Sequence, residues 1–169
     1  KRIATIDEAM KGADVVIALF KSDPNALKPE WIQSMNTKPI VFACSNPVPE
    51  IYPHAAKQAG AYIVATGRGD FPNQVNNSLC FPAILKGATM VRAKKITDKM
   101  AIVAAKSIAK TAEEKGLSPD YIIPTMEQIE VYPAQAALVA EQACKDDVAR
   151  VFLEKSYVYE QTKKDIDDA

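Results

Sequence analysis

Three short runs of apolar residues, rich in β-branched side chains, occur early in the chain, at residues 14–20, 40–44 and 61–65. A continuous apolar run of this length between turn residues is typical of a strand in a parallel sheet that is buried on both faces. The segments between the runs have helical patterns, and Pro29 and Pro53 stand where those helices would begin. Strands that alternate with helices at this spacing predict βαβ units and a parallel sheet with right-handed crossovers.

Helical spacing of apolar residues continues after the second loop, which ends near residue 77, to the end of the chain. Apolar residues cover one face of a segment over residues 79–91. They also cover one face of a segment from Thr97 to Gly116, where Thr97 is a favourable N-cap residue. A further helix is expected from Pro133 onward, followed by a last amphipathic helix. The chain therefore has an α/β part followed by a helical part.

The order of these elements predicts an α/β fold class, namely the second half of a Rossmann-like, doubly wound parallel sheet followed by C-terminal helices. The glycine-rich phosphate turn belongs to the other half, and the Gly-Arg-Gly sequence at 67–69 does not supply it because Pro72 occupies the third glycine position. A three-stranded sheet with a bare edge is a poor fold by itself. We therefore expect residues 1–93 to be the C-terminal half of a nucleotide-binding domain, residues 94–169 to pack on it, and the chain to be the C-terminal piece of a longer protein.

Composition and charge exclude several classes of protein. The 21 basic and 21 acidic side chains balance without a block of like charge, so the chain lacks the electrostatic footprint of a nucleic-acid-binding protein. Its apolar runs are far shorter than a membrane span, and its first residues lack the apolar core of a signal peptide. Cys44, Cys80 and Cys144 are odd in number and match no zinc-site spacing, which suits a reduced, cytoplasmic compartment.

Two asparagine-bearing loops follow the second and third predicted strands, at residues 45–50 and 66–77. Open α/β sheets bind their ligands at the carboxyl ends of the strands, which is where these loops would place Asn46, Asn76 and Asn77. A carboxamide offers both a donor and an acceptor without a charge. Such side chains can hold a hydroxy acid on one side and a nicotinamide amide on the other, so the loops predict part of a dehydrogenase active site.

The asparagines also have structural interpretations. Asn46 before Pro47 is a common turn dipeptide, so it can be a turn former only. Asn76 or Asn77 can cap the following helix, and capping by one of them is compatible with ligand binding by its neighbour. The position of both loops after predicted strands favours the functional interpretation.

Other polar side chains have simpler interpretations than a catalytic or ligand-binding role. Arg68 and Asp70 are expected to form an ion pair that stabilises their loop. Lys21 could meet a phosphate of the cofactor, but a solvated loop lysine is the simpler interpretation. His54, the only histidine of the chain, is expected to be a surface residue.

Longer motifs resemble a known family, the malic enzymes, and in particular their short prokaryotic-type branch. The motifs are PIVFACSNP at 39–47, PEI at 49–51, ATGR at 65–68, DFPNQVNN at 70–77, FP at 81–82, VRA at 91–93 and EVYP at 130–133. The resemblance extends over nearly the whole chain, from the first predicted strand to about Arg150. Motifs of this length are far more specific than a lone glycine signature.

The resemblance implies oxidative decarboxylation of malate to pyruvate and carbon dioxide, with NAD or NADP and a divalent metal, Mg²⁺ or Mn²⁺. In this family the metal polarises the new carbonyl as a Lewis acid, and a general acid protonates the enol. The catalytic lysine, the tyrosine and the carboxylate cluster belong to the region upstream of residue 1, so no catalytic or metal-ligating residue is expected in this segment. The chain alone is expected to be inactive and to need the N-terminal part of the same enzyme. Its helical region with apolar faces predicts a homodimer.

The resemblance assigns two asparagine positions to the substrate. Asn46 resembles the family's asparagine that contacts malate and the nicotinamide ribose region. Asn77, or else Asn76, matches the asparagine that binds the malate carboxylate. Malate would therefore meet a carboxamide from each of the two loops.

The cofactor is expected to contact the first and second loops. Asn46 lies in the nicotinamide region by resemblance, and Ser45 and Pro47 would shape the turn against the nicotinamide. The loop with Phe20 and Lys21 would run along the dinucleotide by position alone. That loop is also a departure from the family, because its residues are bulkier than those of the small glycine-rich turn expected there.

Two other functions stay open at this point. One is another NAD(P)-dependent dehydrogenase, of the amino-acid dehydrogenase type, which would not produce pyruvate from malate. The other is a non-catalytic nucleotide-binding or assembly module, which would bind nucleotide without turnover.

Overall fold

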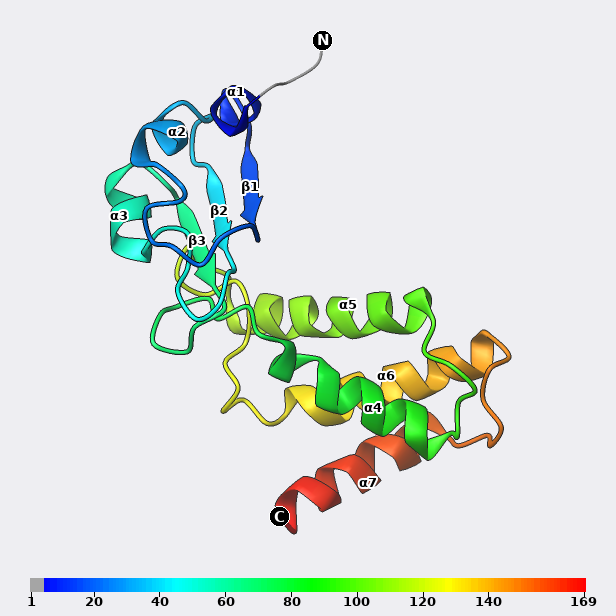
Figure 1. Cartoon of the computed structure of the whole chain (residues 1–169). Coiled ribbons are helices and arrows are strands. Elements are labelled where there is room, and N and C mark those ends of the chain that lie inside the picture. The colour runs from blue at the N-terminus through cyan, green and yellow to red at the C-terminus, as the bar shows by residue number, and fades with distance from the viewer. Residues whose placement is uncertain (1–4) are drawn as a thin grey trace. The chain divides into compact units, whose positions relative to one another are not determined.

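The computed structural model describes residues 5–169, which form two compact units (Figure 1). The sheet unit comprises the described residues up to Asn76 and the short segment Ser118–Tyr121. The helical unit comprises Asn77–Leu117 and Ile122–Ala169. Each unit has a hydrophobic core of its own.

The sheet unit contains a parallel three-stranded sheet with the strand order β1-β2-β3. Its strands are β1 (Val15–Ala18), β2 (Ile40–Ala43) and β3 (Ile63–Thr66), and its helices are α1 (Ile6–Met10), α2 (Pro29–Gln33) and α3 (Pro53–Gln58). A proline opens α2 and α3, where the missing N–H would have had no partner within the helix. The predicted α/β fold class with a parallel sheet is confirmed.

One prediction about the first strand is wrong. The apolar run predicts burial on both faces of β1, whereas the alternating side chains of Val15, Ile17 and Leu19 are 46%, 65% and 70% exposed. The core of the sheet unit forms on the other face, where Val41 of β2 packs with Ile32 of α2. In the described part of the chain β1 is one of the two edge strands, and the face of β1 that carries Val15 and Ile17 is left accessible.

The segment Ser118–Tyr121 is joined to the sheet unit by polar contacts. The Asn73 side chain is buried and donates to the carbonyl oxygens of Val64, at 3.1 Å, and Pro119, at 2.8 Å. Lys57 of α3 forms an ion pair with Asp120. Asn73 has a positive φ of 56°, which asparagine tolerates better than most residues.

The helical unit is built around one central helix. Its elements are η1 (Asn77–Leu79), α4 (Phe81–Met90), α5 (Asp98–Lys115), α6 (Val131–Lys145) and α7 (Lys155–Asp167). α6 contacts α4, α5 and α7, which is visible in Figure 1. Small residues on α6, such as Ala136 and Ala140, are buried, which allows close approach by its neighbours.

The N-terminus of α5 confirms the capping role predicted for Thr97. Its hydroxyl oxygen accepts a hydrogen bond from the Met100 N–H at 3.2 Å and donates to the Asp146 carboxylate at 2.5 Å. The same side chain therefore satisfies an N–H of the first turn and joins α5 to the end of α6.

The two compact units divide between Asn76 and Asn77, earlier in the sequence than the boundary at residues 93 and 94 expected for the whole domain. The difference arises because α4 packs against α6 within the helical unit. The boundary of the domain in the whole protein stays a prediction.

None of the helices described for residues 5–169 is both long enough and apolar enough to cross a membrane.

Candidate functional site

The loops after β1 and β2 meet at one buried carboxylate. Glu50 is fully buried, and its Oε1 accepts hydrogen bonds from the Phe20 N–H at 3.0 Å and from the Ser45 hydroxyl at 2.6 Å. Its Oε2 accepts a third bond from the Ser45 N–H at 3.2 Å. Because the carboxyl ends of parallel strands lie at the same edge of a sheet, a single side chain can reach both loops.

Hydrogen bonds keep this carboxylate ionised in spite of its burial. Burial alone would raise the pKa of Glu50, but the donors from Ser45 and Phe20 outweigh it and hold the pKa below the ordinary value of 4.5. Within residues 5–169 no cationic side chain lies within ion-pair distance of Glu50, so its charge is stabilised by dipoles.

A second link joins the same two loops nearer to the surface. The Ser22 hydroxyl accepts a hydrogen bond from the Val48 N–H at 3.1 Å and donates to the Val48 carbonyl oxygen at 3.2 Å. The loop after β1 is thus attached to the loop after β2 at two points, through Glu50 and through Ser22. These hydrogen bonds limit the positions that the backbone of both loops can take.

The loop after β3 lies against the same turn. The Arg68 guanidinium donates to the Pro47 carbonyl oxygen at 3.0 Å and forms two hydrogen bonds with Asp70, at 2.8 and 2.7 Å. The ion pair expected between Arg68 and Asp70 is therefore confirmed, and it raises the pKa of Arg68 and lowers that of Asp70. Gly67 is buried and touches the Asn46 side chain, since an added Cβ atom would lie 3.3 Å from the Asn46 Oδ1 atom.

The Asn46 side chain is accessible at this edge of the sheet. Asn46 is exposed, whereas its neighbours in the network, Glu50 and Gly67, are buried. The peptide bond between Asn46 and Pro47 is cis. An exposed carboxamide held on a braced turn can donate to one ligand group and accept from another.

The second asparagine loop divides between the two units. Asn76 is the last residue of the sheet unit, and its Nδ2 atom donates to the Gly67 carbonyl oxygen at 3.2 Å. Asn77 is exposed and is the first residue of η1 in the helical unit. The sheet unit therefore brings Asn46 and Asn76 to one set of loops.

Phe20 and Lys21 lie in the loop after β1, as the strand boundaries require. The Phe20 side chain is 49% exposed, and its backbone N–H is bound to Glu50. The Lys21 ammonium forms an exposed ion pair with Asp23 at 2.8 Å, which fits its interpretation as a solvated loop lysine. Cofactor contact by these two residues stays a prediction.

His54 is exposed, which confirms its interpretation as a surface residue. The ring of His54 stacks on that of Tyr52, with ring centroids 5.7 Å apart. The three cysteines are free thiols, and burial raises the pKa of Cys44 and Cys80, which disfavours the reactive thiolate.

The sequence interpretation missed the role of Glu50. It appeared there only as part of a family motif, although an acidic residue next to Ile51 and between two apolar strands was an available signal. Charged residues are almost never fully buried unless they have partners, so the partners of Glu50 had to be found in the fold.

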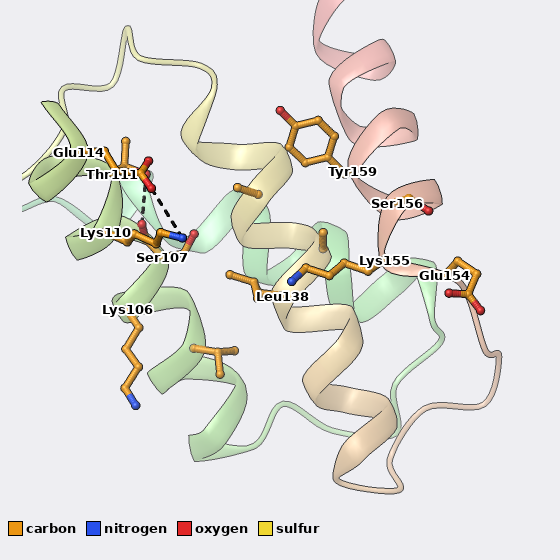
Figure 2. A pocket seen from close by; sticks show the side chains of 13 residues that line it. Lys106, Ser107, Lys110, Thr111, Glu114, Leu138, Glu154, Lys155, Ser156 and Tyr159 are labelled. Carbon is orange, nitrogen blue, oxygen red and sulfur yellow. Dashed lines mark hydrogen bonds and ion pairs between the residues drawn. The ribbon is translucent and has the colours of Figure 1, made fainter.

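The helical unit has a groove that shares no residue with these loops (Figure 2). It lies between α5, α6 and α7, encloses about 840 Å³, and has Leu138 and Tyr159 in its apolar lining. Lys106, Lys110 and Lys155 stand around it, and two of these lysines form ion pairs with glutamates. The groove therefore has an apolar lining between partly neutralised charges.

A family model described as the malic enzyme NAD-binding domain matches residues 8–144. The chain belongs to the malic enzyme family. It is 44% identical over 164 residues to the bifunctional malic/malolactic enzyme of Bacillus subtilis (strain 168), covering 97% of this chain and 40% of that protein. It is 37% identical over 179 residues to the NADP-dependent malic enzyme of Halomonas elongata, covering 97% of this chain and 41% of that protein.

Solved structures of malic enzymes share the fold. The malic enzyme of Entamoeba histolytica has 59% sequence identity and a TM-score of 0.96, over 98% of this chain and 34% of that chain. The malic enzyme of Pyrococcus horikoshii has 51% identity and a TM-score of 0.88, over 94% of this chain and 36% of that chain. The chain thus spans about two fifths of the length of these curated relatives and about a third of these solved chains.

Proposed function

We propose that this chain is part of an enzyme that oxidises and decarboxylates malate to pyruvate and carbon dioxide, with NAD or NADP as the hydride acceptor. Membership of the malic enzyme family supports the reaction class. The observation that carries the proposal for this chain is the exposed Asn46 carboxamide on a turn braced by Glu50, at the ligand-binding edge of a parallel sheet. The chain alone is inactive and works with the N-terminal part of the enzyme.

Asn46 is proposed to serve both ligands. Its Nδ2 atom can donate to an oxygen of malate while its Oδ1 atom accepts from the nicotinamide side. The contact with Gly67 and the bond from Arg68 to Pro47 limit the positions that this turn can take. A fixed carboxamide orients malate for hydride transfer with less loss of entropy on binding.

Asn77 is the better candidate of the two adjacent asparagines for the malate carboxylate. The Nδ2 atom of Asn76 already donates to the Gly67 carbonyl oxygen, so Asn76 has a structural role in its loop. Asn77 is exposed at the start of η1, where its carboxamide is accessible. Ser45, Phe20 and Lys21 complete the proposed cofactor side, with Ser45 acting mainly through its position next to Asn46.

The divalent metal is proposed to be bound by the remainder of the enzyme. Within residues 5–169 no group of three or more histidine, cysteine, aspartate or glutamate side chains could hold a metal ion. The residues of this chain alone do not fit a metal centre, so none of the roles above involves the metal. A homodimer and a cytoplasmic location complete the proposal.

The test is a comparison of asparagine variants in the whole enzyme. Asn46→Ala and Asn77→Ala should each lower kcat/KM for malate by roughly 100-fold, equivalent to about 3 kcal/mol of transition-state stabilisation. Asn36→Ala is the matched control, because its carboxamide binds Asp14 at 2.8 Å, away from the strand tips, and it should keep wild-type kinetics. Wild-type kcat/KM in both Asn46 and Asn77 variants would refute the assignment.

The product identifies the reaction. Formation of pyruvate and reduced cofactor from malate, and from no amino acid, supports the malic enzyme reaction. Turnover of an amino acid would instead indicate a different dehydrogenase. Nucleotide binding without turnover of any substrate would indicate a non-catalytic module.

A further inference from the structure

Glu50 is the one fully buried ionisable side chain among residues 5–169, and it lies directly behind the turn that carries Asn46. The other acidic residues of the sheet unit are exposed or partly exposed, so water screens their charges. Glu50 has no such screening and no cation beside it in the described part of the chain. Its negative field therefore extends into the adjoining turn.

We propose that Glu50 is a positioning residue for Ser45 and Asn46, and that its buried charge makes the site prefer the oxidised nicotinamide to the reduced one. This inference rests on the proposed function, because it requires the turn at Ser45 to face the nicotinamide. It adds a specificity determinant to that function.

The positioning role follows from the hydrogen bonds. Ser45 gives both its N–H and its hydroxyl to the same carboxylate, so its backbone and its side chain are both fixed. Asn46 follows directly in the sequence. The Phe20 N–H is bound to the same carboxylate, so a movement of Glu50 would shift the loop after β1 as well.

The charge preference follows from the chemistry of the cofactor. An oxidised nicotinamide ring carries one positive charge, and the ring is neutral after it accepts a hydride. A fixed negative charge nearby attracts the oxidised ring and has little effect on the reduced one. Such a site takes up the oxidised cofactor and releases the reduced product more easily, which suits an enzyme working in the direction of malate oxidation.

A purely structural role for Glu50 makes a different prediction. If the carboxylate served only to join the loops, its loss would weaken the binding of both cofactor forms by the same factor. The ratio of the dissociation constants of the two forms therefore separates charge from scaffold. That ratio does not require turnover of any substrate.

The experiment uses the whole enzyme and its Glu50→Gln variant, titrated with NAD⁺ and NADH and with NADP⁺ and NADPH. In the variant, the dissociation constant of the oxidised cofactor should rise roughly tenfold relative to that of the reduced cofactor. This is the size expected of one charge at about 10 Å and an effective dielectric constant of about 20. Glu30→Gln removes an exposed charge from α2 of the same unit and should leave the ratio unchanged. An unchanged ratio in a folded Glu50→Gln variant overturns the proposal.

If Glu50→Gln does not fold, the double variant Ser45→Ala/Glu50→Met replaces it, because it removes the charge together with one of the hydrogen-bond donors of that charge. The double variant should shift the ratio in the same direction as Glu50→Gln, and an unchanged ratio overturns the proposal. Two variants that keep the charge are the controls. Ser45→Ala removes a hydroxyl donor but keeps the charge, so it should lower kcat/KM for malate while preserving the ratio. Glu50→Asp also keeps the charge and should keep a ratio near that of the wild type. A shift in the ratio with Ser45→Ala equal to that expected of Glu50→Gln would contradict the role of the charge. Failure of the malic enzyme reaction itself would appear separately, as wild-type enzyme that binds nucleotide but makes no pyruvate.

Discussion

Gly87 of α4 lies so close to Ala136 of α6 that a Cβ atom added to Gly87 would be 2.4 Å from the Ala136 carbonyl oxygen. Such a distance is shorter than van der Waals contact, so only glycine fits there without a shift of one helix. The same added atom would lie 3.0 Å from the Cβ atom of Val139. The packing of α4 on α6 at this point therefore depends on the absence of one side chain.

Gly87→Ala should destabilise the whole enzyme although alanine is the better helix former. Overpacking of a rigid contact typically costs about 1–3 kcal/mol, which exceeds the gain of about 1 kcal/mol in helix propensity. Thermal or urea unfolding measures the difference. Thr89→Ala, at an exposed position of the same helix, is the control and should unfold at or near the wild-type midpoint. A Gly87→Ala enzyme as stable as the wild type would contradict the close contact.

Thr97→Ala should destabilise the helical unit by about 1 kcal/mol, the usual cost of losing an N-cap side chain. The Met100 N–H loses its acceptor, and the Asp146 carboxylate loses the donor that contributes most to lowering its pKa. Thr97→Ser keeps the hydroxyl and should restore most of the stability. Equal destabilisation by both substitutions would attribute the effect to the lost methyl group.

Arg68→Ala should impair substrate or cofactor binding more than it affects folding. The exposed ion pair with Asp70 contributes little to stability, but the bond from Arg68 to the Pro47 carbonyl oxygen holds the turn of Asn46. We expect KM to rise several-fold while the unfolding midpoint changes little. Asp70→Asn removes the ion pair and keeps the Pro47 contact, so its KM should stay closer to the wild-type value. A larger rise in KM in Asp70→Asn than in Arg68→Ala would argue against this role of Arg68.

The Glu50 network should make stability depend on pH in the acid range. The pKa of Glu50 is lowered on folding, so the unfolded chain binds the proton more readily than the folded one. The stabilisation is fully present above the unfolded value of 4.5 and is lost as pH falls through the folded pKa. Urea unfolding between about pH 6 and about pH 3 should show this loss, and Glu50→Gln should reduce it. If the stability of the variant depended on pH in the same way as that of the wild type, Glu50 would be excluded as a source of the pH dependence.

The periodicity of the sequence was sufficient to predict the order and the type of the main helices and strands. Continuous apolar runs predicted the three strands, prolines marked the starts of α2 and α3, and Thr97 marked the start of α5. These signals are local, since each depends on residues within one or two turns of the element. The position of Asn46 after a strand followed from the same local pattern, and the family motifs added the chemistry.

The tertiary structure alone decided how the loops are held and which surfaces are buried. Phe20 and Glu50 are 30 residues apart in the sequence, so no periodic pattern could connect them. An apolar run also does not reveal how many of its faces are covered, which is why Ile17 is exposed in a strand whose pattern predicts burial. Burial and buried polar networks depend on contacts between distant segments, and those contacts exist only once the chain has folded.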